Sequence, residues 1–125
     1  MLAHKDAMAT IAVKDLGVAK KFYQDILGFS SAGAEGVGVV TLRSGKSTIV
    51  IYETEFAGTN KATSATWGVG DDIDSIVQTL RLAGVPFEHY DIPGLQCEGD
   101  VHVAGEFRAA WFRDPDGNIL HLNNQ

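Results

Sequence analysis

The sequence has a single cysteine, only three prolines and no run of basic residues. One cysteine excludes an intrachain disulfide and favours a reducing compartment, so we expect a cytoplasmic protein in which Cys97 is an inert loop residue. The densest basic stretch is Lys20-Lys21 and the net charge is −6, which argues against nucleic acid and membrane surfaces as partners. No hydrophobic stretch approaches the roughly 20 residues of a membrane helix, and the N-terminus does not resemble a signal peptide.

What the sequence does contain is an ordinary globular mixture, with 45% hydrophobic and 21% charged residues. This composition carries no signature of disorder. A chain of 125 residues is long enough to bury a core, and we expect one domain over residues 1–125. An anionic substrate would need a local cation, and the arginines that could provide one are Arg43, Arg81, Arg108 and Arg113.

Two segments carry apolar residues at the three- and four-residue spacing of an amphipathic helix. The first covers residues 18–27, with Asp15 placed to cap its start and Gly28 to end it. The second covers residues 73–83, follows a pair of aspartates and ends at Gly84. Each helix is preceded by a short strand-like run, so the same local order occurs twice in the chain.

The two halves align when the chain is shifted by 56 positions. The matched identities are Thr10 with Thr66, Val13 with Val69, Asp15 with Asp71 and Gly28 with Gly84. The expected strands are residues 9–13, 30–34, 37–43, 48–53, 65–69, 87–90, 107–113 and 119–123. The pattern predicts an α+β fold of two βαβββ modules related by an internal duplication.

Neither half can bury its helix and its sheet alone, since each has only about 60 residues. We therefore expect module 1 at about residues 8–55, a linker at about 56–64 and module 2 at about 65–125. The two sheets are expected to join, within the chain or across a dimer, into a curved mixed sheet with the helices outside and a hollow between the halves. Hollows between modules are where small ligands usually bind.

The end of the chain, Ala110–Leu122, reads as a strand, a tight turn and a strand. Asp114-Pro115 presets the turn and Asp116-Gly117 closes it. This segment resembles the last hairpin of the vicinal oxygen chelate superfamily, the glyoxalase/bleomycin-resistance/dioxygenase group. Residues 13–29 resemble the opening helix of that family, and residues 67–73 resemble the opening of its second module. The resemblance implies the two-module cup-shaped fold and a homodimer.

Metal-dependent members of this family place one ligand on each of four strands. The matching positions in this sequence are Met8, Val50, Ser64 and His121. Only His121 is a good ligand for a transition metal, since a thioether, an isopropyl group and a hydroxyl do not hold zinc, nickel or iron. We therefore expect no cofactor and no divalent metal at the family position.

Without a metal, a ligand must be held by aromatic and polar side chains. The residues that we expect to line the cup and bind a ligand are His121, Trp67, Tyr52, Trp111, Arg108 and Phe56. The candidates for acid/base catalysis are His121, His102 and Glu106, because a histidine pKa near 6.5 suits proton transfer. For each aromatic residue the alternative is simple core packing, and for His121 it is a satisfied histidine on the concave face.

The segment from Tyr90 to Glu106 is the least regular part of the sequence. A loop of this length in a small domain is often functional, and we expect a partly ordered loop over residues 91–106 that covers the mouth of the cup. The alternative is a solvated excursion with no role in binding.

Three functions remain open on the sequence. The favoured hypothesis is a metal-free protein that binds a small organic molecule, similar in architecture to the bleomycin-resistance proteins. The first alternative is a metal-dependent enzyme resembling lactoylglutathione lyase or a ring-cleaving dioxygenase; a glutathione substrate would need more cationic anchors than four arginines offer. The second alternative is a metal-free enzyme that uses His121, with His102 or Glu106, as its acid/base group. As an enzyme of either kind, the chain would be a lyase, an isomerase or a dioxygenase of this superfamily.

Overall fold

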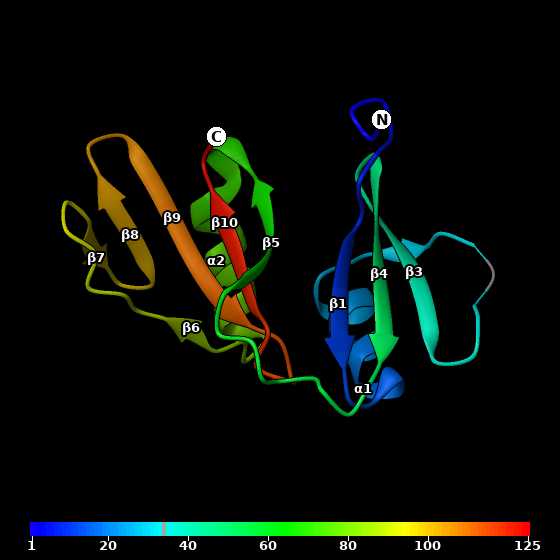
Figure 1. Ribbon diagram of the computed structural model, residues 1–125. Helices are drawn as coiled ribbons and strands as arrows, with labels where there is room; N and C mark the ends of the chain where they lie inside the picture. Colours follow the sequence, from blue (N-terminus) through cyan, green and yellow to red (C-terminus); the bar gives the residue numbers. More distant parts are fainter. Residues whose placement is uncertain (34) are drawn as a thin grey trace. The chain divides into compact units, whose positions relative to one another are not determined.

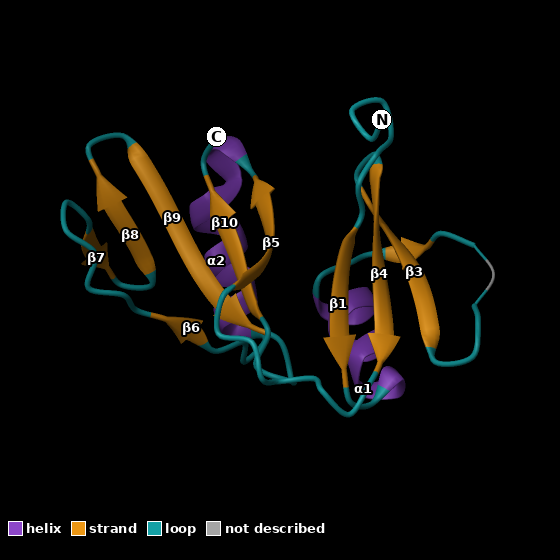
Figure 2. Cartoon of the chain, in the orientation of Figure 1, coloured by secondary structure: helices purple, strands orange, loops and turns teal. Residues whose placement is uncertain are grey.

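The chain divides into two compact units, Met1–Thr59 and Asn60–Gln125. The computed structural model describes residues 1–33 and 35–125. The division falls within the connector expected at residues 56–64, although Thr63 and Ser64 already belong to a strand. Each unit is a sheet with a helix against one face (Figures 1 and 2). No helix in the described part of the chain is long and apolar enough to cross a membrane.

The first unit contains one four-stranded sheet. Its elements are β1 (Ala9–Val13), α1 (Leu16–Lys20), the π-helix η1 (Lys21–Ile26), β2 (Ser30–Ser31), β3 (Val39–Ser44) and β4 (Ser47–Glu53). The strand order is β1-β4-β3-β2, with β1 parallel to β4 and the other pairs antiparallel. The strand expected at residues 30–34 is shorter in the structure because its two residues are exposed serines. The last residue of that expected strand, Ala34, lies outside the described residues.

The first helix begins and ends where its sequence signals indicate, but its second half is wider than an α-helix. The carboxylate of Asp15 accepts a hydrogen bond from the Val18 amide at 3.0 Å, and Gly28 has a φ of 82°. The Leu27 amide donates to the Phe22 carbonyl, five residues back, at 3.0 Å. This bonding pattern defines a π-helix, and it buries the neighbouring rings of Phe22 and Tyr23 together.

The second unit repeats this plan and enlarges it. Its elements are β5 (Thr63–Gly68), the 3-10 turn η2 (Gly70–Asp72), α2 (Ile73–Leu82), β6 (Phe87–Glu88), β7 (Gln96–Glu98), β8 (Val101–Ala104), β9 (Phe107–Arg113) and β10 (Ile119–Asn123). The main order is β5-β10-β9-β8-β7, and β6 also pairs with β9. Strands β5, β10, β9 and β6 therefore stand where β1, β4, β3 and β2 stand in the first unit, and both sheets begin with a parallel pair.

Among the residues that the structure describes, the hairpin of β7 and β8 has no counterpart in the first unit. It corrects the expectation of an irregular loop over residues 91–106, since Gln96–Glu98 and Val101–Ala104 are paired strands. Strand β8 pairs with the first half of β9, and β6 pairs with the second half of β9. The hairpin was missed because all three residues of β7 are exposed, so no apolar alternation marks the strand.

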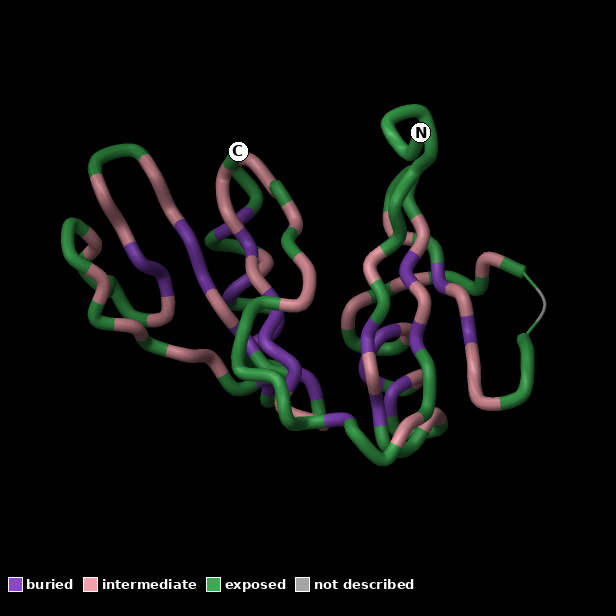
Figure 3. The backbone as a smooth tube through the Cα atoms, viewed as in Figure 1, coloured by how far each residue is buried: buried purple, intermediate pink, exposed green. Residues whose placement is uncertain are grey.

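Each unit buries its own apolar residues between its helix and its sheet (Figure 3). The first core consists of Ile11, Val13, Ala19, Phe22, Tyr23, Val40, Leu42, Ile49 and Ile51. The second consists of Ile73, Val77, Leu80, Val85, Val101, Ala110, Phe112, Leu120 and Leu122; Ala109 and Ile119 are also buried, on the other side of the sheet. In the second sheet, Leu120 pairs with Phe112 and Leu122 with Ala110. Arg108 belongs to the same alternation as Ala110 and Phe112 and bonds Asp74 on α2, which identifies this as the helix side.

The opposite side of the second sheet, which α2 does not cover, is called the open face below. Alternation along β9 assigns Ala109, Trp111 and Arg113 to it. The register then adds His121, which pairs with Trp111, and His102, which pairs with Ala109. The open face therefore collects aromatic and imidazole side chains from three adjacent strands.

The turn between β9 and β10 is fixed by one buried carboxylate. Asp114 is 4% exposed, and its Oδ1 accepts hydrogen bonds from the amides of Asp116 at 2.9 Å and Asn118 at 2.8 Å. Its Oδ2 accepts one from the Asn118 side chain at 2.7 Å. Gly117 supplies the positive φ of 85° that the turn requires. This confirms the hairpin expected from Asp114–Asn118 and fixes the register that brings His121 opposite Trp111.

Candidate functional site

Five rings form a continuous series along the open face of the second sheet. They are His89, Tyr90, His102, Trp111 and His121, and we call them the ring row. His121 stacks on Trp111 with centroids 4.4 Å apart and planes 26° from parallel. His102 and Tyr90 meet Trp111 edge-on, at 4.9 and 5.2 Å, and His89 stacks on His102 at 6.4 Å. Trp111 is therefore the centre of the row.

His121 has a defined tautomer. Its Nδ1 lies 3.1 Å from the Ala110 carbonyl, which only accepts, so Nδ1 carries the proton and donates. The amide orientation of Asn123 supports this, because its Oδ1 accepts from the Gln125 amide and its Nδ2 thus faces His121 Nε2 at 3.4 Å. Burial lowers the pKa of His121, with the nearby His102 adding to the effect, although the bond to Ala110 opposes it. The ring is a neutral base whose Nε2 is a hydrogen-bond acceptor.

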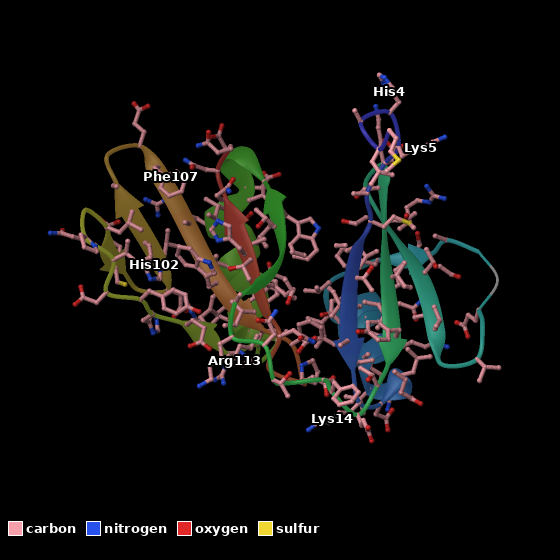
Figure 4. All side chains as sticks on the ribbon, viewed as in Figure 1. His4, Lys5, Lys14, His102, Phe107 and Arg113 are labelled. Carbon is pink, nitrogen blue, oxygen red and sulfur yellow. The ribbon has the colours of Figure 1, made fainter. Side chains whose placement is uncertain are left out.

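His102 is fully buried beneath its neighbours. Its Nε2 accepts a hydrogen bond from the Tyr90 amide at 2.9 Å, as only a neutral ring with its proton on Nδ1 can. Burial lowers the pKa of His102; the Ala109 carbonyl opposes this, although no hydrogen bond of good geometry reaches Nδ1 within the described residues. His102 is thus a positioning residue that holds the Tyr90 backbone against the sheet. Figure 4 shows its place on β8.

At the hairpin end of the row, Asp100 joins two basic side chains. Its Oδ1 lies 2.7 Å from His89 Nε2, and its Oδ2 accepts from Arg81 Nε at 2.7 Å. Burial alone would raise the pKa of Asp100, but the hydrogen bonds from Arg81 and His89 lower it. This cluster ties the β7–β8 turn to α2 and to the segment after β6.

At the other end of the row, an ion pair between Arg113 and Glu88 lies on the open face beside Trp111. Arg113 Nε donates to Glu88 Oε1 at 2.8 Å, and both residues flank Trp111, since Glu88 pairs with Trp111 across β6 and β9. Arg113 is labelled at this end of β9 in Figure 4. Burial raises the pKa of the Tyr90 phenol, and the Glu88 carboxylate raises it further. The phenol therefore stays protonated and able to donate.

Arg108 does not join the residues around His121. Its guanidinium lies on the helix side, 2.7 Å from Asp74 and 3.8 Å from Glu98. The reason is the alternation of β9, which directs Arg108 and Trp111 to opposite faces of the sheet. Glu106 is also separate from the row, because it is an exposed residue of the turn between β8 and β9.

The remaining expected aromatic residues are not part of the ring row. Trp67 pairs with Leu122 on β10, whereas Thr66 is the residue opposite His121, so alternation assigns Trp67 to the helix side. Tyr52 lies on β4 of the first unit and is 37% exposed. Phe56 lies in the turn that follows β4 and is 72% exposed. Of the six residues expected to bind ligand, the ring row brings together His121 and Trp111.

Three of the four family metal positions, Met8, Val50 and Ser64, carry side chains that are poor metal donors. On the first sheet, alternation assigns Met8 to the same side as Thr10, which pairs with Val50; on the second, Ser64 lies in a bulge of β5 with no partner on β10. No three His, Cys, Asp or Glu side chains within residues 1–33 and 35–125 gather closely enough to hold a metal ion. A thioether, an isopropyl group, a hydroxyl and one imidazole do not fit a catalytic divalent cation.

Sequence reasoning missed four residues that shape this face: Glu88, His89, Tyr90 and Asp100. His89 and Tyr90 follow a two-residue strand, and nothing local indicates that their rings reach β8 and β9. The one usable signal was the alternation of Trp111 with Ala109 on β9, which predicts that any strand paired there adds its own side chains beside the indole.

A family model described as the Glyoxalase/Bleomycin resistance protein/Dioxygenase superfamily matches residues 6–122. Virulence protein STM3117 of Salmonella typhimurium is 26% identical over 123 residues, covering 90% of this chain and 78% of the relative. The fosfomycin resistance protein FosX from Mesorhizobium loti has a TM-score of 0.72 at 14% identity, with 98% of this chain and 92% of that chain covered.

Lactoylglutathione lyase from Agrobacterium tumefaciens has a TM-score of 0.69 at 15% identity, with coverage of 95% of this chain and 92% of that chain. At such identities these likenesses show the fold, the α+β arrangement expected from the sequence, and they leave the chemistry of the site to its own residues. The family model, in contrast, covers almost the full sequence. The chain belongs to the Glyoxalase/Bleomycin resistance protein/Dioxygenase superfamily.

Proposed function

We propose that this chain binds a small aromatic molecule on the open face of its second sheet, and that it does so without a metal ion. In this respect it would resemble the bleomycin-resistance-type members of the superfamily. The observation that carries the proposal is the stacked pair of Trp111 and His121, which joins a large aromatic surface to a neutral acceptor. Tyr90 adds a second ring and a phenol at the same place.

The metal-free part of the proposal rests on donor chemistry. Catalytic zinc and iron sites use three or more His, Cys, Asp or Glu ligands, and the family positions here offer one, His121. A ring that donates Nδ1–H to a backbone carbonyl, as His121 does, still has Nε2 available as a ligand, so it is the number of ligands that disfavours a metal. For this reason we favour metal-free binding over a metal-dependent lyase or dioxygenase activity.

A second candidate function has one observation in its favour. The lowered pKa of His121 makes it the free base at neutral pH, as a general base must be. A ligand held at Trp111 with an acidic proton near Nε2 would be a substrate for metal-free proton abstraction. His102 and Glu106 are less suited to this role, since His102 is buried with Nε2 occupied and Glu106 lies in a distant turn.

The test combines metal analysis with ligand binding. Purified protein is analysed for transition metals, and a library of aromatic compounds is screened by thermal shift, where a compound at a hundredfold excess over its dissociation constant adds about 2.7 kcal/mol of stability. Hits are then measured on Trp111→Leu and on Leu82→Ala, a control at an 81% exposed residue of α2. We expect binding to be lost in the first variant and kept in the second.

Two results would contradict the proposal. One is a stoichiometric transition metal whose removal abolishes activity or binding. The other is a set of hits that bind Trp111→Leu as tightly as the natural chain. Size-exclusion chromatography with light scattering tests the homodimer that we also propose, with an expected mass of twice 13.4 kDa.

A further inference from the structure

The net charge of the chain belongs to its second unit. Residues 60–125 carry ten acidic and four basic side chains, whereas residues 1–59 carry six of each. The ring row therefore lies on a unit with the full formal charge of −6. A field of this sign attracts cations and repels anions before contact is made.

The arginines of the second unit are already paired with carboxylates. Arg81 bonds Asp100 at 2.7 Å, Arg108 lies between Asp74 and Glu98, and Arg113 bonds Glu88 at 2.8 Å. The fourth cation, Lys61, lies in the connector before β5. Of these groups, only Arg113 is on the open face, and an anion that reached it would also meet the Glu88 carboxylate.

The hydrogen-bonding group on this face, His121 Nε2, also disfavours an anion, because it accepts and needs a donor from the ligand. His121 Nε2 is an acceptor by two independent contacts: Nδ1 donates to the Ala110 carbonyl, and the Asn123 amide approaches Nε2 with its NH₂. The Asn123 contact is long, at 3.4 Å, so a stronger donor from a ligand is favoured in its place. A carboxylate or phosphonate has no proton to offer Nε2.

From this geometry we propose that the ligand is an aromatic molecule that carries an N–H or O–H donor for His121 Nε2 and has no negative charge. The inference rests on the proposed binding function and adds the chemical class of the ligand. Glu88 is the specificity-determining residue: by neutralising Arg113 it removes the cation that an anionic ligand would use. The open face thus discriminates between ligands in two ways: Glu88 disfavours anionic ligands, and His121 Nε2 favours ligands that carry a hydrogen-bond donor.

Four indoles of matched ring shape test both parts. Indole is neutral with a donor, 1-methylindole is neutral without one, tryptamine is a cation and indole-3-acetate is an anion. Binding is followed by the imidazole resonances of His121 in NMR spectra, with the fold checked by circular dichroism. We expect indole and tryptamine to bind, 1-methylindole to bind roughly tenfold more weakly because one hydrogen bond is lost, and indole-3-acetate to bind at least about tenfold more weakly.

The variant Glu88→Gln decides the charge part. It leaves Arg113 without its carboxylate partner, so indole-3-acetate is expected to gain about tenfold in affinity while indole changes by less than about twofold. Asp71→Asn, which removes the same charge at an exposed position before α2, is the control and should alter neither. Both variants replace a partly or fully exposed side chain, and each is compared at equal folded fraction.

The outcomes separate the two proposals. If indole-3-acetate binds the natural chain as well as indole does, or Glu88→Gln fails to favour it, the inferred ligand class is wrong while the binding function stands. If 1-methylindole binds as well as indole, the hydrogen bond to Nε2 is refuted. If none of the four perturbs His121, the open face is not an aromatic-binding surface and the proposed function is overturned with the inference.

Discussion

Replacing Asp114 by alanine should destabilise the second unit strongly, because this carboxylate organises the turn that sets the register of β9 and β10. It accepts hydrogen bonds from two backbone amides and from the Asn118 side chain, at 2.7 to 2.9 Å. A hydrogen bond to a charged group contributes roughly 1.5–3 kcal/mol, but bonds that share one carboxylate are not additive. We expect a loss of about 3 kcal/mol in the free energy of unfolding.

Asp114→Asn refines this prediction. It keeps an acceptor for the two amides but turns an NH₂ group toward the NH₂ of Asn118, so about half of the loss is expected to remain. Asp71→Ala is the control for charge and should change stability by less than about 0.5 kcal/mol. Urea unfolding followed by circular dichroism measures all three. If Asp114→Ala lies within about 1 kcal/mol of the natural chain, the turn does not depend on this carboxylate and the reasoning fails.

Three further predictions concern pH, the core and a helix end. Burial lowers the pKa of His102 and His121, so below a pH of about 6.5 the unfolded chain binds protons that the folded chain does not bind. The free energy of unfolding should therefore fall as the pH drops through the lowered pKa values of the folded chain. Urea titrations should show a weaker pH dependence in the double variant His102→Gln/His121→Gln. Leu120→Ala, at 0% exposure, should cost about 2–5 kcal/mol by thermal or urea unfolding. Gly28→Ala forces a side chain to a φ of 82° and should cost about 1–2 kcal/mol, whereas Gly17→Ala, in α1, should cost less.

Much of the fold was predictable because its signals are local. Asp15 and Gly28 bracket the first helix as expected, and the strands at residues 9–13, 107–113 and 119–123 were predicted with their observed bounds. Apolar alternation and turn residues suffice for such elements. The π-helix was not predictable, because its apolar spacing satisfies an α-helix equally well, and the β7–β8 hairpin was not, because its outer strand buries nothing.

The candidate site was less accessible to sequence reasoning, since it depends on pairing between distant strands. His121 and Trp111 are joined by a hairpin whose turn is visible in the sequence, and both were among the expected residues. His102 joins them only through the register of β8 on β9, and Tyr90 only through the hydrogen bond that its backbone N–H donates to His102 Nε2. Arg108 was assigned to the ligand because its strand was known but the face it occupies was not.

The β7–β8 hairpin makes the two modules unequal in size and in the side chains that they carry. The first sheet ends at the short β2, while the second carries an additional pair of strands and, with them, His102, which contacts Trp111 in the ring row. If both modules descend from one ancestor and the proposed binding function is correct, selection for ligand binding should have acted mainly on the second module. A comprehensive mutational scan should then find polar and bulky substitutions tolerated at Met8 and Val50, and rejected at Trp111 and His121.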